Sequence, residues 1–130
     1  YKSELNKIFK NLLDIFLSLF GWRKTAIVCG ISMIPTLDDG DFVFFKEYAA
    51  NKSILKMGDI IIFNHPLKKI RLIKRVKTIK EFSIEVSGDN KSSSSDSNFF
   101  GAIQKEKIIG IVTSKISIKL ILKIKNLINP

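Results

Sequence analysis

The chain has 130 residues, of which 45% are hydrophobic and 26% charged, and its formal net charge is +10 at pH 7. This size fits one domain with one core, and the composition excludes a disordered chain and a polytopic membrane protein. Nineteen of the 22 basic residues are Lys and three are Arg, whereas a protein that reads nucleic acid uses Arg more often. We therefore interpret the charge as a solvated, Lys-rich surface. The alternative is a non-catalytic basic module that binds nucleic acid or anionic lipid.

Cysteine and histidine each occur once, as Cys29 and His65. One cysteine excludes an internal disulfide and a Cys-based zinc site, and one histidine leaves few ligands for a transition metal. We therefore expect no metal, no cofactor and a cytoplasmic location, with association with a membrane as the alternative. We interpret Cys29 as a buried strand residue rather than a reactive thiol, and His65 as a turn residue before Pro66.

The first twenty residues carry the pattern of an amphipathic helix. Apolar residues recur at the spacing of one helical face, at Leu5, Ile8, Phe9, Leu12, Leu13, Phe16, Leu17 and Phe20. The opposite face carries Lys7, Lys10, Asn11, Asp14 and Ser18. A spanning helix needs about 20 mostly apolar residues, and Asp14 interrupts this run well before that length. We expect the helix to pack on the domain or on a partner, and the alternative is a peripheral position in a membrane interface.

From Gly21 onward the hydrophobic period becomes extended. Short apolar or alternating runs occur at residues 25–29, 41–46, 59–63, 70–78, 82–87 and 108–113, with turn-forming residues between them. Several strands at short spacing without intervening helices predict a small, mostly β domain. We therefore divide the chain into an N-terminal helix (1–21), a β domain (22–114) and a basic, apolar extension (115–130), whose pattern fits either a strand or a helix.

Ser32 is the first candidate for chemistry. It lies between a predicted strand and a turn that contains Pro35, where a scissile carbonyl could reach its hydroxyl. A serine hydroxyl is a weak nucleophile and needs a base. His65 is the one histidine available, and nothing in the sequence places it near Ser32, so a Ser-His-Asp triad lacks support.

Lys74 is the alternative base. On a strand it shares a face with Ile70, Leu72 and Val76. Burial on such a face disfavours the charged amine and lowers the lysine pKa, and a drop of about 2 units needs about 3 kcal/mol. The pattern alone favours a different reading, in which an inward-pointing lysine protects an edge strand against aggregation.

Four ordered motif blocks change this balance. They are Gly30-x-Ser32-Met33-x-Pro35-Thr36-Leu37-x-x-Gly40-Asp41, Gly58-Asp59-Ile60-Ile61-x-Phe63, Ile73-Lys74-Arg75-Val76, and Gly88-Asp89-Asn90-x-x-x-Ser94-x-Asp96-Ser97-x-x-x-Gly101. Together they resemble the type I signal peptidase (S26) family of serine proteases, over residues 28–112. The resemblance implies a small, signal-peptidase-like antiparallel β domain that follows the N-terminal amphipathic helix.

The resemblance also implies a Ser/Lys dyad. Ser32 would be the nucleophile, with its backbone N–H in the oxyanion hole, and Lys74 the general base. Ser94 matches the family serine that orients this lysine. Met33 and Pro35 would lie at the substrate-binding cleft.

Two positions depart from the family pattern. Gly30 stands where some members carry a serine whose hydroxyl completes the oxyanion hole, so a second donor is not identified. Asn98 replaces the arginine that usually pairs with Asp96, so Asp96 needs another partner for its supporting role.

The compact size favours a particular branch of this peptidase family, the one whose members have a small catalytic domain. The short stretch from Val76 to Gly88, and Phe63-x-His65-Pro66 before the lysine block, resemble the maturation proteases of nickel-type superoxide dismutase. We therefore predict a serine endopeptidase that removes an N-terminal extension from that dismutase precursor. The main alternative is a membrane-associated signal peptidase that cleaves exported preproteins. A self-cleaving repressor is disfavoured because no DNA-binding helix-turn-helix is visible in the first twenty residues.

Overall fold

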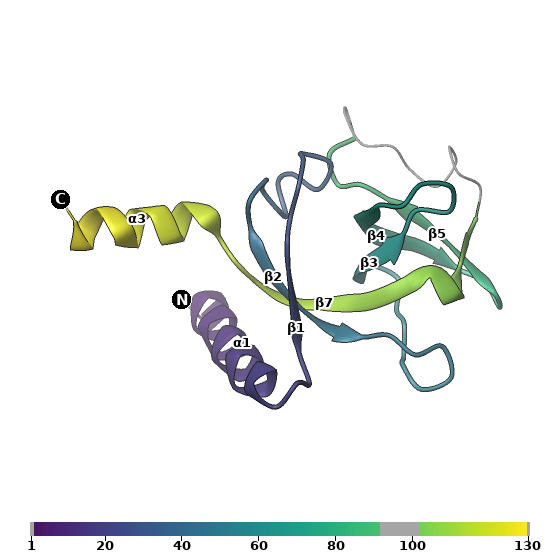
Figure 1. Ribbon diagram of the computed structural model, residues 1–130, viewed down its shortest axis with the longest axis horizontal. Helices are drawn as coiled ribbons and strands as arrows, with labels where there is room; N and C mark the ends of the chain where they lie inside the picture. The colour runs from purple at the N-terminus through teal and green to yellow at the C-terminus, as the bar shows by residue number, and fades with distance from the viewer. Residues whose placement is uncertain (1, 92–101, 130) are drawn as a thin grey trace.

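The computed structural model describes residues 2–91 and 102–129 as one antiparallel sheet with a helix near each end of the chain (Figure 1). The mostly β fold with an N-terminal helix is confirmed. The elements in chain order are α1 (Lys2–Leu19), β1 (Lys24–Ile27), β2 (Phe42–Glu47), β3 (Ile60–Asn64), β4 (Arg71–Ile79), β5 (Ser83–Ser87), β6 (Ile103–Gln104), the short 3-10 helix η1 (Lys105–Lys107), β7 (Ile108–Ile116) and α3 (Ile118–Ile128).

All six predicted strands are present, and the main differences lie near the C-terminus. Strand β6 was not predicted, because two residues are too short to show a period. The ambiguous extension contains both structures that its pattern fitted: β7 continues to Ile116, and α3 begins at Ile118. The predicted boundary between residues 114 and 115 therefore lies inside β7, and the division into three parts stays a prediction.

The sheet order is β1-β2-β7-β3-β4-β5-β6. The last long strand therefore lies between β2 and β3, and it pairs antiparallel with both. Gly110 of β7 pairs with Glu47 on one side and with Ile62 on the other. A Cβ at Gly110 would lie 2.2 Å from the Phe45 ring, so a glycine is needed where these strands meet.

Two clusters of buried apolar residues stabilise the sheet. The first gathers side chains from β3, β4, β5, β6 and β7, including Phe63, Val76 and Ile84. The second joins the segment between β1 and β2 to the sheet, and it consists of Val28, Met33, Leu37, Val43, Phe45 and Ile62. Residues on both sides of Ser32 are thus held in the core, and this fixes the position of the Ser32 turn.

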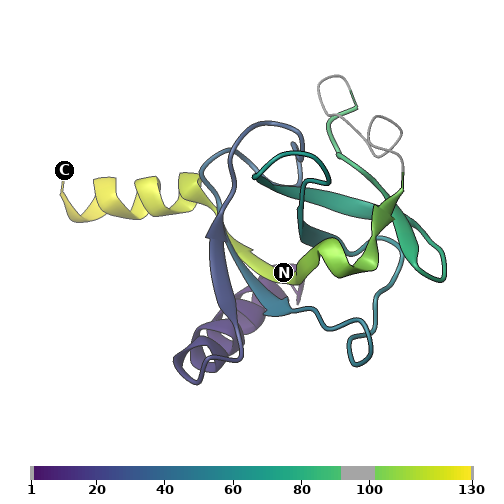
Figure 2. The same ribbon diagram turned by 45° about the vertical axis from the view of Figure 1, so that its right-hand side comes forward.

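The N-terminal helix forms as predicted but packs in the opposite sense from the one we favoured. Its one buried residue is Asp14, and most of its apolar side chains are exposed. The polar face docks on β7, and α1 lies beside the β2–β7 region in both views (Figures 1 and 2). The apolar face therefore does not pack on this domain, and the other half of the expectation, packing on a partner, stays a prediction. The hydrogen bonds from Thr113 and Ser114 to Asp14 hold the helix against β7, and the ion pair between Asp14 and Arg23 joins it to the segment that follows. Among the helices of the described residues, none is long and apolar enough to cross a bilayer.

Candidate active site

Ser32 lies on the segment that connects β1 to β2. The turn before it needs a glycine, because Gly30 has a φ of +94°. The N–H of Gly30 donates a 2.7 Å hydrogen bond to Asp39 Oδ1, which closes the loop on itself. Ser32 is half-buried, and its carbonyl accepts a 2.9 Å hydrogen bond from the N–H of Asn90. No hydrogen bond joins its own N–H or hydroxyl to another residue in the parts of the chain that the structure describes.

A cleft of about 270 Å³ opens beside Ser32. The end of β1 and the segment that follows it form one wall, and the start of β4 forms another. The lining residues are Ala26, Ile27, Val28, Cys29, Ser32, Met33, Phe45, Ile62, Arg71, Leu72 and Ile73. The lining is mostly apolar, so the cleft suits an apolar group better than a charged one.

Three predicted residues can be placed relative to this cleft. Met33 lines it and is at the same time part of the core, and its role in substrate binding stays a prediction. Pro35 is exposed and is not among the lining residues, so its role in substrate binding stays a prediction. Cys29 is exposed and lies just beyond the end of β1, so its interpretation as a buried strand residue is wrong. The strand ends before Cys29 because the chain turns at Gly30.

Lys74 is buried in β4, with 4% of its surface exposed. It pairs in register with Ile61, which is fully buried, and Val76 on the same face of the strand belongs to the core. Ile70 is exposed and precedes the strand, so the apolar face is shorter than predicted. Leu72 and Ile73, immediately before Lys74, line the cleft that also contains Ser32. Removal of an amine from water disfavours its charged form. A general base has to be in the neutral form before it can accept a proton.

Arg75 connects the motif blocks to one another. Its Nε and Nη2 donate to the two carboxylate oxygens of Asp89 at 2.8 and 2.7 Å, and its Nη1 donates to the carbonyl of Gly58 at 2.7 Å. The hydroxyl of Thr36 donates to the same carboxylate. The hydrogen bond from Arg75 lowers the pKa of Asp89 below its ordinary value of 3.8, and the same contact raises the pKa of Arg75. A bidentate pair of this kind fixes geometry as well as charge.

Further contacts complete the support of the Ser32 turn. The side-chain amide of Asn90 donates to the carbonyl of Ile31 at 3.0 Å, next to the backbone bond to Ser32. The Lys115 ammonium donates to the carbonyl of Thr36 at 2.7 Å. Segments that are far apart in sequence therefore hold the turn from both sides.

Arg75, Asp89, Thr36 and Asn90 all lie within the four blocks, but no role for them was predicted from the sequence. The alternation of a strand offered one signal: a charged residue next to an inward-pointing lysine must face the other side. Arg75 and Asp89 are 14 positions apart, and no local pattern in the sequence indicates their contact.

The remaining predicted residues divide into two groups. Ser94, Asp96 and Asn98 lie outside the described residues, so their roles stay predictions. His65 is buried, and its Nδ1 accepts hydrogen bonds from the N–H groups of Leu67 and Lys68, which agrees with a turn residue. Across residues 2–91 and 102–129, no group of three or more His, Cys, Asp or Glu side chains is arranged to hold a metal ion.

Comparison with known proteins agrees with this arrangement. The family model described as "Signal peptidase, peptidase S26" matches residues 5–85. The chain belongs to this family. The match covers most of α1, the Ser32 turn and β4 with Lys74, so it includes both walls of the cleft.

The curated relatives are signal peptidases from bacteria. "Signal peptidase I" of Buchnera aphidicola subsp. Schizaphis graminum is 36% identical over an alignment of 86 positions that covers 56% of this chain and 27% of the relative. "Signal peptidase I P" of Bacillus subtilis subsp. natto is 32% identical over 79 residues, which are 61% of this chain and 43% of the relative. "Signal peptidase I T" of Bacillus subtilis strain 168 is 42% identical over 50 residues, 38% of this chain and 26% of the relative. The matched regions thus span less than half the length of each relative.

Proposed function

We propose that this chain is a serine endopeptidase in which Ser32 is the nucleophile and Lys74 the general base. The observation that carries the proposal is the assembly of separate motif blocks around one cleft: Ser32 lines it, and the strand that bears the buried Lys74 forms a wall. Family membership supports a peptidase reaction. Burial supports the role of Lys74, because a neutral amine can accept a proton and an ammonium cannot.

The reaction would proceed through an acyl-enzyme. The neutral amine of Lys74 takes the proton of the Ser32 hydroxyl while Oγ bonds to the scissile carbonyl carbon. The backbone N–H of Ser32 donates to the oxyanion that forms. The C–N bond then breaks, and the leaving amine takes the proton from Lys74. Water attacks the ester carbonyl, again with Lys74 as base, and the proton returns to Ser32 Oγ as the product acid leaves.

Two substrates are candidates. The sequence favoured the dismutase precursor over an exported preprotein, and the names of the relatives favour the exported preprotein. The matched proteins are named as signal peptidases, which favours the N-terminal signal segment of an exported preprotein. The precursor of nickel-type superoxide dismutase remains the second candidate. The short connection between β4 and β5, residues 80–82, favours it, because it leaves the β domain compact.

Substitution of the two proposed catalytic residues tests the dyad. Ser32→Ala and Lys74→Met should each lower kcat/KM for precursor cleavage at least about 1,000-fold, since each removes a group that acts in the transition state. Circular dichroism and the unfolding midpoint should show that both variants stay folded. Ser83→Ala and Lys77→Met, on β5 and β4, are the matched controls and should keep wild-type activity.

Near wild-type cleavage by either catalytic variant would refute the dyad. Incubation with a secretory preprotein and, separately, with a nickel superoxide dismutase precursor identifies the substrate when the new N-terminus is read by mass spectrometry. If no precursor is cleaved, and salt-dependent DNA binding survives Ser32→Ala, the non-catalytic basic module is the correct reading.

A further inference from the structure

The cleft beside Ser32 contains one charge that the proposed reaction does not use. Among the described residues that line the cleft, Arg71 is the one charged residue, and apart from Ser32 and Cys29 the others are apolar. Arg71 is the first residue of β4, it is exposed, and it pairs in register with Asn64 at the end of β3. Arg71 therefore brings a positive charge to the wall of an otherwise apolar cleft.

The chain has three arginines, and two of them are paired with a carboxylate. Arg23 contacts Asp14 at 2.9 Å, and Arg75 contacts Asp89 at 2.7 Å. Within residues 2–91 and 102–129, no hydrogen bond or ion pair engages the side chain of Arg71. The guanidinium of Arg71 is therefore available to a ligand in the cleft.

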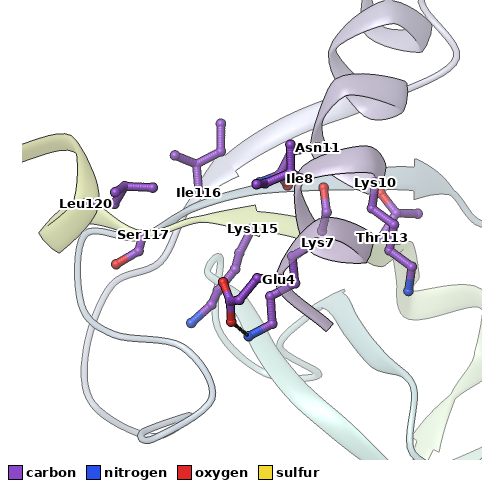
Figure 3. A pocket seen from close by; sticks show the side chains of 11 residues that line it. Glu4, Lys7, Ile8, Lys10, Asn11, Thr113, Lys115, Ile116, Ser117 and Leu120 are labelled. Atoms are coloured by element: carbon purple, nitrogen blue, oxygen red, sulfur yellow. Dashed lines mark hydrogen bonds and ion pairs between the residues drawn. The ribbon is translucent and has the colours of Figure 1, made fainter. Parts of the chain in front are cut away.

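A larger cavity, of about 470 Å³, lies between α1 and β7, and its charges are arranged differently (Figure 3). Two of its three lysines have partners in the chain. Lys7 pairs with Glu4 at 3.3 Å, and Lys115 donates to the carbonyl of Thr36 at 2.7 Å. Because these charges are largely compensated, an anionic group is expected in the Ser32 cleft rather than in this cavity.

The position of Arg71 on β4 fixes where such a group would lie. Arg71 precedes Lys74 by three residues, which is about 10 Å along a strand. In the proposed reaction Lys74 acts at the scissile bond, and an extended peptide advances by the same distance per residue. A substrate residue about three positions from the scissile bond would therefore lie level with Arg71.

We propose that Arg71 determines specificity by binding an Asp or Glu side chain of the substrate at about this position. The guanidinium presents its donors in a planar fork that matches both oxygens of a carboxylate, as Arg75 does with Asp89. The apolar remainder of the cleft then holds the neighbouring substrate residues. This inference rests on the proposed peptidase function, because it assigns the charge of a substrate side chain to that same cleft.

Cleavage of a set of host peptides by the full chain tests this specificity. Each fluorescein-labelled peptide consists of Ala, Val and Ser with one Glu, Gln or Lys, whose position moves along the peptide. Mass spectrometry locates the scissile bond. The kcat/KM should be at least about tenfold higher with Glu than with Lys at one or two adjacent positions, about three residues from that bond. Attraction to the net charge of +10 would instead favour Glu equally at every position, and that result would overturn the proposal.

Two variants assign the preference to Arg71. Arg71→Glu should reverse it, so that Lys is favoured over Glu at the same positions by at least about threefold. Lys69→Glu is the matched control, because it makes the same change in net charge at an exposed residue that does not line the cleft. It should keep the wild-type ratio of Glu to Lys. An unchanged ratio in Arg71→Glu, with the fold intact by circular dichroism, would overturn the proposal.

Binding of the same peptides to Ser32→Ala, measured by fluorescence polarisation, separates the two proposals. The Kd should be at least about tenfold lower for the preferred Glu peptide than for its Lys counterpart, and Ser32→Ala/Arg71→Glu should reverse this order. Cleavage by wild type without any charge preference would refute the role of Arg71 and keep the peptidase. Binding with the preference but without cleavage would refute the peptidase and keep the acidic-peptide site. Neither binding nor cleavage would overturn both.

Discussion

At the scale of single residues, the site depends on side chains that never touch the substrate in the proposed reaction. Asp89 is the clearest case. Its two oxygens receive Arg75 from β4 and Thr36 from the Ser32 turn, so one carboxylate ties together two segments of the candidate site. The neighbouring Asn90 holds the carbonyls of Ile31 and Ser32. Ser32 is thus positioned in part by Asp89 and Asn90, which lie more than 50 positions later in the chain.

Asp89→Asn should remove the carboxylate that joins Arg75 to Thr36. It should also remove the pH dependence of that carboxylate's contribution to the free energy of unfolding. The substitution should lower the free energy of unfolding at pH 7 by about 1–3 kcal/mol, since it weakens hydrogen bonds to a charged group. The folded-state pKa of Asp89 lies below its ordinary value, so its contribution is complete above about pH 4 and is lost as the pH falls through the folded-state pKa. Urea unfolding at pH 7, 5 and 3 should therefore show equal differences at the first two and a smaller one at the third.

Glu81→Gln, at an exposed position between β4 and β5, is the control and should change stability by less than about 0.5 kcal/mol. A difference between Asp89→Asn and wild type that is the same at all three pH values would contradict the assignment of this pH dependence to Asp89.

At the scale of elements, β4 shows how one strand serves two purposes. Alternation sends Lys74 and Val76 to the buried face and Arg75 to the network around Thr36 and Asp89. A shift of one residue in the pairing of β3 with β4 would exchange these faces. The register, with Ile61 opposite Lys74, is therefore what makes a buried amine and an ion-paired guanidinium compatible in adjacent positions.

Helix α1 depends on a single polar anchor, so Asp14→Ala should release it. Loss of the charged hydrogen bonds should cost about 1.5–3 kcal/mol of docking free energy, and the amides of α1 should exchange with deuterium at least about tenfold faster. The amides of β2, β3 and β7 should keep their protection, because α1 adds few contacts to the core. Glu4→Ala removes an exposed pair on the same helix and should change little. Unchanged exchange in α1 would show that other contacts dock it.

At the scale of the whole molecule, both helices lie outside the two cores. Helix α3 has no buried residue and extends away from the sheet in both views (Figures 1 and 2). Its first turn is nevertheless attached: the N–H of Ile118 donates to Asp41 Oδ1 at 3.0 Å, and Lys119 lies 3.6 Å from Asp38. Asp41 is fully buried at the end of the Ser32 turn, so the start of α3 helps to support the candidate site.

Two truncations separate these contributions of α3. A chain that ends after Leu120 keeps the bond to Asp41, and its Tm should stay within about 2 °C of the full chain. A chain that ends after Ile116 leaves the buried Asp41 without the N–H of Ile118 and should lose about 3–8 °C, which corresponds to about one hydrogen bond. Thermal unfolding followed by circular dichroism measures both. Equal losses in the two chains would mean that the body of α3, and not its first turn, carries the stability.

The sequence by itself determined the elements and the candidate residues. Periods of 3.6 and 2 predicted α1 and six strands, because side-chain direction follows directly from backbone geometry. The order of the motif blocks was enough to single out Ser32 and Lys74, whose roles stay predictions. Where two local structures fitted equally well, as after residue 114, the sequence could not choose between them.

Only the tertiary structure decided which surfaces meet. A period identifies two faces of α1 but not which of them docks, and that choice depended on Arg23, Thr113 and Ser114 being close enough to bind Asp14. In the same way, the fold brought Asp89 to Arg75 and Thr36, and it ended β1 before the exposed Cys29. Such contacts join residues far apart along the chain, so they follow from packing and strand pairing rather than from any local pattern.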